Sequence, residues 1–399
     1  SSHKGLQQAA GSALRQQAAG SALRPHEPAM AASDGSGSLD ALKEMFKVSH
    51  NVPSTPERGL SGEVRPRTIW GYWAQGYEEM PDFFKLCVDT WQRHNPHWDV
   101  RILQKSTLLE YVSEADLPNR FMHMFSHQTA SDAVRLAVLA RYGGVYMDVS
   151  ILLRSSLDEL CWNAISEGSR AAAVFYHPYY GTPAFGHQDL TESWFLATRP
   201  GNPFFIRWRD LLRELLHNRL DIDGLLQHPL YQGIDLSGID RLNKQFVGLD
   251  FDFREYLAIH AMCHRLIETD KQARAQWRDD FIRIDAAQTA FRLQLHAEQS
   301  GRYAAEALVS PEPWAEHLLE GVPLVKFTTP HSGPLVPLPR AQLLDRRALL
   351  GRLLTEQPAT PAAGAGGHAG TTAVGAMRVT VPRGPRGFCS VASALCIGV

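Results

Sequence analysis

The hydrophobic and polar positions of this chain switch between a period of two residues and a helical period, with short polar or Gly/Pro-rich connections between them. Residues 67–73 (RTIWGYW) and 98–104 (WDVRILQ) are rich in strand-forming residues. Residues 81–94, between them, place apolar side chains on one helical face and end at an Asn-Pro pair. This order of strand, helix and strand predicts an α/β fold with a mostly parallel central sheet flanked by helices.

The clearest pattern is the run at residues 129–153, TASDAVRLAVLARYGGVYMDVSILL. Its first part predicts an amphipathic helix, capped by the T-x-x-D sequence that begins at Thr129. Gly143 and Gly144 end this helix, because glycine readily adopts the left-handed conformation that a helix terminus needs. The residues from Val145 onward then predict a single strand with alternating side chains.

Charged side chains give this run its candidate chemistry. Asp132 and Arg135 lie three positions apart, so an ion pair on the helix is a sufficient structural explanation for both. Asp148 has no such explanation, because a lone carboxylate in the middle of a buried strand is costly when unpaired. A carboxylate near a cation suits a diphosphate leaving group, whose charge a divalent metal with oxygen ligands stabilises. Asp148 and Ser150 share one strand face and have the spacing of two metal ligands.

The sequence SDAVRLAVLARYGGVYMDVS resembles the motif of the sugar-transferase superfamily that contains capsular polysaccharide synthesis proteins and glycosyltransferase family 32. Members carry an Asp and an Arg on a helix, then Tyr-Gly-Gly, then an Asp-x-Asp strand. The later sequences WFLATRPGNPFFIRW and PLVKFT resemble the fungal-type branch, so the resemblance extends from residue 65 to residue 330.

The resemblance implies a GT-A-like, Rossmann-related fold over residues 61–357. It also implies a glycosyltransferase of hexosyltransferase type that moves a sugar from a nucleotide-diphosphate donor to a glycan or other hydroxyl acceptor, with retention. Asp148 and Arg135 are the expected catalytic residues, and Mn²⁺ or Mg²⁺ is the expected cofactor. The expected donor-binding residues are Tyr72, Trp73, Asp132, Arg135, Gly144, Tyr146 and Asp148, and the expected metal ligands are Asp148, Ser150 and His331.

Several of these residues have a second explanation. Tyr72 and Trp73 end the first strand, where an aromatic ring can stack on a nucleotide base, but packing in the core is the more common reason for an aromatic residue there. His331 lies in a late loop, either as a metal ligand or as a surface histidine. Glu192 and Ser193 belong either to an acceptor site or to a solvated strand end.

Ser150 stands where the motif has its second Asp. A hydroxyl is a weak metal ligand, so metal affinity should fall or depend on the donor's own phosphates. The alternative function is therefore a non-catalytic relative that binds a nucleotide sugar or a glycan. A toxin-like effector would share the site but needs a delivery segment, for which the sequence has no candidate.

Further along the chain, residues 176–186 predict a loop that closes over the donor. Helices are expected from Phe253 and over residues 343–354, and Asp285 is expected to cap the helix that follows it. Asp250 and Asp252 are further carboxylates without an assigned role.

Composition adds little to these predictions of fold and function. The chain has 399 residues, 44% hydrophobic content and a formal net charge of −2, which suit a large core and give no argument for nucleic acid as a partner. No run of about 18 apolar residues predicts a membrane span. Five scattered cysteines without a C-x-x-C pair favour free thiols. Residues 1–60 and 358–399 are expected to be disordered, and the location is open between the secretory pathway, if an anchor precedes Ser1, and the cytoplasm.

Overall fold

The structure is a computed structural model that describes residues 64, 66–178, 190–245, 252–310 and 313–357. The predictions for residues 1–60 and 358–399, for most of the loop at 176–186 and for Asp250 lie outside the described residues.

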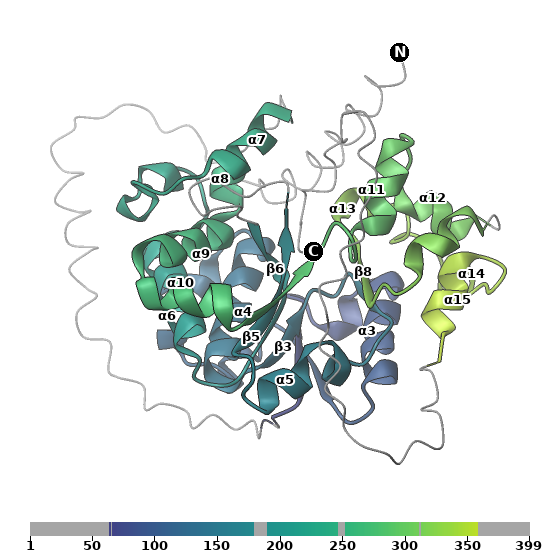
Figure 1. Ribbon diagram of the computed structural model, residues 1–399, viewed down its shortest axis with the longest axis horizontal. Helices are drawn as coiled ribbons and strands as arrows, with labels where there is room; N and C mark the ends of the chain where they lie inside the picture. The colour runs from purple at the N-terminus through teal and green to yellow at the C-terminus, as the bar shows by residue number, and fades with distance from the viewer. Residues whose placement is uncertain (1–63, 65, 179–189, 246–251, 311–312, 358–399) are drawn as a thin grey trace, which may run out of the picture.

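A central sheet organises the described chain (Figure 1), with strand order β2-β1-β3-β6-β5-β7. β6 is antiparallel to both neighbours, β3 and β5, whereas β1 is parallel to β2 and β3, and β5 is parallel to β7. A separate antiparallel pair joins β4 to β8. The strands are β1 Thr68–Tyr72, β2 Asp99–Leu103, β3 Gly144–Met147, β4 Ile151–Leu153, β5 Ala172–His177, β6 Leu190–Thr198, β7 Phe281–Asp285 and β8 Leu324–Lys326.

Helices cover both faces of this sheet, so the predicted α/β fold with a mostly parallel central sheet flanked by helices is confirmed. The α-helices are α3 Asp82–His94, α4 His127–Tyr142, α5 Asn163–Ser166, α6 Pro203–Leu215, α7 Ser237–Gln245, α8 Phe253–Tyr256, α9 Ala258–Thr269, α10 Lys271–Asp279, α11 Arg292–Gln299, α12 Ala304–Val309, α13 Thr329–Ser332, α14 Arg340–Leu343 and α15 Leu349–Thr355.

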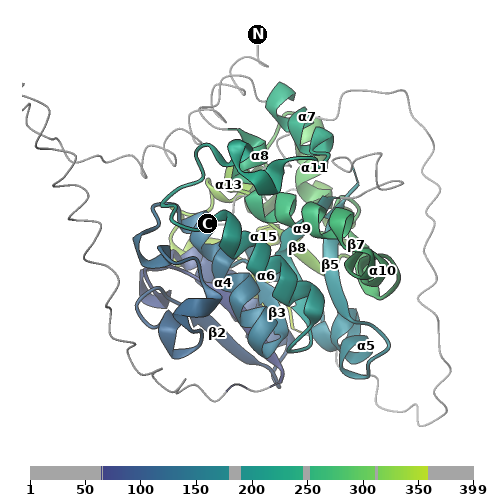
Figure 2. The ribbon, with the colours of Figure 1, turned by 90° about the vertical axis from the view of Figure 1, so that its left-hand side faces the viewer.

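Alternate residues of the strands enter two separate hydrophobic cores. Trp70 and Tyr146 point to the face that α4, α6, α9 and α10 cover, and Ile69 and Met147 point to the face that α3, α11, α12 and α15 cover. Figure 2 shows α4 and α6 beside each other in front of β3. Because both faces are buried, the strands read as nearly continuous apolar runs.

The corner between α4 and β3 differs from the prediction at its start. α4 begins at His127, and the side chain of Ser126 caps it by accepting a hydrogen bond from the backbone N–H of Thr129 at 3.1 Å. The predicted T-x-x-D cap is therefore wrong, because Thr129 and Asp132 already lie inside the helix. The helix ends at Tyr142 and is followed, as predicted, by Gly143, whose φ of 63° is left-handed.

The predicted single strand after these glycines is also wrong, because it divides into β3 and β4. Asp148 donates its backbone N–H to Trp194 at 2.9 Å, and its carbonyl accepts from Ile151 at 3.1 Å. This turn carries the chain from the central sheet to the β4–β8 pair. Asp148 therefore lies directly after β3 and not in the middle of a strand.

Other boundaries need smaller corrections. The helix expected from Phe253 begins there but breaks into α8 and α9. Of the helix expected over residues 343–354, only the second half forms, as α15, while α14 already ends at Leu343. Asp285 accepts from the backbone N–H of Gln288 and stabilises a turn, whereas α11 begins later. In the described part of the chain, no helix combines the length and the apolar character that a membrane crossing requires.

Candidate active site

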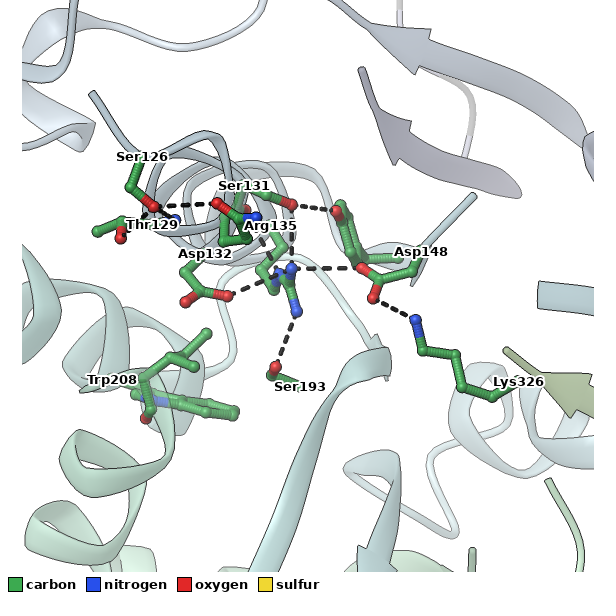
Figure 3. A network of polar contacts seen from close by, with 12 residues as sticks. Ser126, Thr129, Ser131, Asp132, Arg135, Asp148, Ser193, Trp208 and Lys326 are labelled. Atoms are coloured by element: carbon green, nitrogen blue, oxygen red, sulfur yellow. Dashed lines mark hydrogen bonds and ion pairs between the residues drawn. The ribbon is translucent and has the colours of Figure 1, made fainter. Parts of the chain in front are cut away.

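The candidate site lies where β3 ends, at the carboxyl edge of the sheet. α4 carries Asp132 and Arg135 to this edge, and the turn after β3 carries Asp148. Arg135 Nη2 lies 3.2 Å from Asp132 Oδ1 and 3.3 Å from Asp148 Oδ1. Figure 3 shows the two carboxylates on opposite sides of the guanidinium. The predicted ion pair on the helix is therefore confirmed, and it extends to the carboxylate of the strand end.

Arg135 is almost completely buried, and its remaining polar atoms also have partners. Its Nη1 donates to Ser193 Oγ at 2.8 Å, and its Nη2 donates to Ser131 Oγ at 3.0 Å. Ser131 Oγ also shares a hydrogen bond of 2.8 Å with Tyr146 Oη, and the Tyr146 ring lies 4.8 Å from the guanidinium carbon. The guanidinium is thus fixed in position by four elements of the fold.

Asp148 has a second cationic partner on its other side. Lys326 Nζ, from β8, donates to Asp148 Oδ2 at 2.8 Å and to Ser150 Oγ at 2.7 Å. Lys326 is fully buried, with an exposure of 0%. Figure 3 shows its side chain pointing toward Asp148. The lone carboxylate that the sequence predicted is therefore paired twice, which explains how it can be buried.

The surroundings shift the ionisation of the two carboxylates in opposite directions. Burial raises the pKa of Asp132 to about 7, although the positive charge of Arg135 opposes this. Burial alone would also raise the pKa of Asp148, but the charges of Lys326 and Arg135 hold it below its ordinary value. Asp148 is therefore ionised at neutral pH, whereas Asp132 is poised near its midpoint.

The expected metal ligands do not form a metal site in this arrangement. Both oxygens of Asp148 face cations, and Ser150 Oγ accepts from Lys326. His331 is completely buried, so it is not a surface histidine. Its Nδ1 accepts from the N–H of Ala304 at 2.9 Å, and its Nε2 lies 2.7 Å from Glu298. The predicted ligand role of His331 is corrected accordingly, and the described residues hold no group of three or more His, Cys, Asp or Glu placed to bind a metal.

Other predicted site residues divide between the site and the scaffold. Gly144 lies at the opposite end of β3, roughly 13 Å from Asp148 along the strand, and a Cβ there would meet Thr68 O at 2.4 Å. Its role is therefore close backbone packing rather than donor binding. Tyr72 ends β1, whose register with β3 places it at the level of Asp148. Its buried Oη has no hydrogen-bond partner among the described residues.

Two further predicted residues lie near this edge. Trp73 packs against Phe84 with ring centroids 5.6 Å apart, and its buried Nε1 likewise has no partner within the described ranges. Glu192 and Ser193 are both buried in β6, so the alternative of a solvated strand end is wrong. Ser193 joins the site through Arg135.

Lys326 is the residue that the sequence reasoning missed. It lies 178 positions from Asp148 in the sequence, so no local spacing connects the two. One indication was available, because a lysine within the apolar strand PLVKFT can be buried only beside an anion.

The fold and the site together consist of an α/β sheet with a buried cluster of carboxylates and cations at its carboxyl edge. Residues 41–224 match the model of a family described as capsular polysaccharide synthesis protein.

Two similar proteins are named as glycosyltransferases. O-glycosyltransferase braB of Annulohypoxylon truncatum is 23% identical over 278 residues, which cover 62% of this chain and 65% of braB. Glycosyltransferase afumC of Aspergillus fumigatus is 26% identical over 309 residues, 70% of this chain and 78% of afumC. The chain thus spans less than two thirds of the length of braB.

Two solved structures with a distant likeness are glycosyltransferases as well. Galactosyltransferase LgtC, in complex with donor and acceptor sugar analogues, has a TM-score of 0.31 and 12% identity, covering 74% of this chain and 98% of LgtC. The PaToxG glycosyltransferase has a TM-score of 0.28 and 15% identity, covering 54% of this chain and 84% of PaToxG. Likeness at this level bears on neither the donor nor the site.

Proposed function

We propose that the protein is a glycosyltransferase with a GT-A-like fold that moves a sugar from a nucleotide-diphosphate donor to a hydroxyl acceptor. One observation carries this proposal: Arg135 contacts both Asp132 and Asp148 at the carboxyl edge of the sheet, within the residues that match the family model. In open α/β sheets, ligands bind outside the carboxyl ends of the strands.

The exposure of Asp132, Arg135 and Asp148 suggests a separate role for each of them. The side chain of Asp132 is 15% exposed, against 2% for Arg135 and 5% for Asp148, so Asp132 is the one that a donor can reach most easily. Arg135 holds both carboxylates in place. Its charge also acts at short range in a poorly solvated environment, where it favours a diphosphate group that becomes more negative as it departs.

The proposal extends to the acceptor and the stereochemistry. The name of braB describes an O-glycosyltransferase, which supports a hydroxyl group as the acceptor here. Transfer of a hexose with retention follows from the resemblance of the motif to the sugar-transferase superfamily. Glu192 and Ser193 are the proposed acceptor-side residues, and Tyr72 Oη, which lacks a partner among the described residues, is a proposed donor contact.

The direct test is turnover of nucleotide sugars. Wild type should hydrolyse or transfer at least one UDP- or GDP-sugar, and Asp132→Asn should reduce the rate by about a hundredfold, comparable to the loss of a well-placed catalytic group. Asp158→Asn is the matched control, because Asp158 is a partly buried carboxylate that pairs with Arg67 and Trp98 away from the site. Equal rates for wild type and Asp132→Asn would contradict the proposal.

The second candidate function is a non-catalytic relative that binds a nucleotide sugar or glycan, and Ser150, in place of the second carboxylate, is the observation that favours it. Binding of a nucleotide sugar without any turnover, across a panel of hydroxyl acceptors, would select this alternative.

A further inference from the structure

Lys326 occupies a fixed place in the fold, opposite the turn that carries the site. In the β4–β8 pair it stands directly across from Ile151, and the next residue, Phe327, donates its N–H to Ser150 O at 3.0 Å. The backbone N–H of Lys326 itself donates to Ala290 O at 3.1 Å. The lysine side chain is therefore aimed at the turn by backbone pairing on both sides.

The ammonium group bridges the two side chains that have the spacing of metal ligands. Its distances to Asp148 Oδ2 and Ser150 Oγ, 2.8 and 2.7 Å, are those of charge-assisted hydrogen bonds. An Asp-x-Asp pair with one divalent cation has no net charge, and Asp148 with Ser150 and one lysine also has none. The net charge therefore stays at zero when one carboxylate is replaced by a hydroxyl and the divalent cation by a monovalent one.

A divalent ion would fit poorly beside these groups. Arg135 Nη2 lies 3.3 Å from Asp148 Oδ1, so a metal at Asp148 would stand between two fixed cations. The protein would supply only a single carboxylate and a hydroxyl, so water and the donor's phosphates would have to supply most of the roughly six oxygen ligands of Mg²⁺ or Mn²⁺. The donor set at this turn thus matches an ammonium group and not a protein-held metal.

We propose that Lys326 replaces the divalent metal of this site, so that binding of a nucleoside diphosphate group needs no added metal ion. Lys326 is a positioning residue, because its buried ammonium acts through Asp148 and Ser150, which it holds in one orientation. This inference rests on the proposed function, which supplies the nucleoside diphosphate as the ligand. It adds that Lys326, and not a metal ion, provides the positive charge beside Asp148.

The first measurement is the affinity of wild type for UDP and GDP by isothermal titration, in EDTA and in Mn²⁺. We expect the same dissociation constant, within about twofold, in both conditions. Lys326→Met keeps most of the side-chain length without the charge and should weaken the binding of UDP and GDP by about tenfold or more. Lys326→Arg keeps the charge and should retain part of this affinity. Lys244→Met is the matched control, since Lys244 is exposed and pairs only with Asp240 in the described structure.

The second measurement needs no nucleotide. In the double variant Ser150→Asp/Lys326→Met, an Asp-x-Asp pair without the lysine should bind Mn²⁺, which electron paramagnetic resonance detects, whereas wild type should not. Circular dichroism checks that each variant is folded. If Lys326→Met alone is unfolded, the comparison of Mn²⁺ binding between wild type and the double variant still tests the inference.

Two results would overturn the inference: Mn²⁺ bound stoichiometrically by wild type at this turn, or diphosphate binding that EDTA abolishes. If no nucleotide binds under any condition, the proposed function fails, while the Mn²⁺ resonance of wild type and the double variant still tests the role of Lys326.

Discussion

Arg135 connects the polar groups of the site at the scale of single residues. Its buried guanidinium pairs with Asp132 and Asp148 and donates to Ser131 and Ser193. A buried cation of this kind is stable only when its partners are all in place, and each partner depends on it in turn. Its removal should therefore affect stability as well as activity.

Arg135→Met should lower the free energy of unfolding by about 3–5 kcal/mol, because it leaves the buried Asp148 and the partly buried Asp132 without their shared cation. Urea denaturation followed by circular dichroism measures this. The control is Arg141→Met on the same helix, whose exposed pair with Asp116 should contribute only about 0–1 kcal/mol. Equal losses for the two variants would contradict this account of Arg135.

The raised pKa of Asp132 makes a prediction about pH. Between its unfolded value near 3.8 and its folded value of about 7, the folded protein holds a proton that the unfolded chain has lost. Stability from this group is therefore present at low pH and is lost as pH rises through about 7. As the pH rises from about 5 to about 8, the free energy of unfolding of Asp132→Asn should rise relative to that of wild type by on the order of 1–3 kcal/mol.

Unfolding in urea at a series of pH values measures this difference between the two proteins. A stability difference that is constant across the range would mean that the pKa of Asp132 is not raised in the folded state.

The sequence predicted part of this site at residue scale. The ion pair of Asp132 and Arg135 follows from helical spacing, and Asp148 stood out as a buried carboxylate without a local partner. His331 and Lys326 were assigned wrongly or missed, because their partners lie on elements whose packing a single sequence does not reveal. Whether a histidine meets a metal or Glu298 depends on that packing.

The corner between α4 and β3 positions the site at the scale of elements. Gly143 and Gly144 both have positive φ, and a Cβ at Gly144 would meet the carbonyl of Thr68 at 2.4 Å. The backbone thus approaches the neighbouring strand more closely than any side chain allows. This contact fixes the start of β3, and through β3 the place of Asp148.

Gly144→Ala should therefore destabilise the protein by more than Gly201→Ala. Gly201 also has a positive φ, 71°, but a Cβ there meets nothing within 4 Å. The control should lose about 1–2 kcal/mol for the left-handed backbone alone, and Gly144→Ala should lose about 1–3 kcal/mol more, since it also forces a clash. Thermal unfolding of both variants measures the difference, and equal midpoints would show that close packing at Gly144 is unimportant.

The division of the predicted strand into β3 and β4 shows what periodicity cannot give. Every residue from Val145 to Leu153 is buried, and Asp148 and Ser150 keep the alternation of a continuous strand, so the pattern does not mark the turn. The turn forms because Asp148 bonds to Trp194 of β6, a partner that alternation of side chains does not identify. Element types were predicted well, whereas this boundary depended on tertiary pairing.

For the whole molecule, the site lies where the two helical layers meet the carboxyl edge of the sheet. Arg135 comes from the layer on one face, and Lys326 comes from the β4–β8 pair on the other side. The βα order of the sequence predicted helices on both faces of a parallel sheet, and β1 is indeed parallel to β2 and β3. It could not predict that β6 runs antiparallel between β3 and β5, because strand direction leaves no trace in hydrophobic pattern.

Ligand binding should stabilise the whole molecule if the site is a donor site. A donor at a hundred times its dissociation constant adds about 2.7 kcal/mol to the free energy of unfolding. The most direct test is therefore the unfolding midpoint of wild type and Asp148→Asn with a panel of UDP- and GDP-sugars. At least one nucleotide sugar should raise the unfolding midpoint of wild type, and Asp148→Asn should lose this shift. No shift with any nucleotide sugar, or the same shift in both proteins, would contradict it.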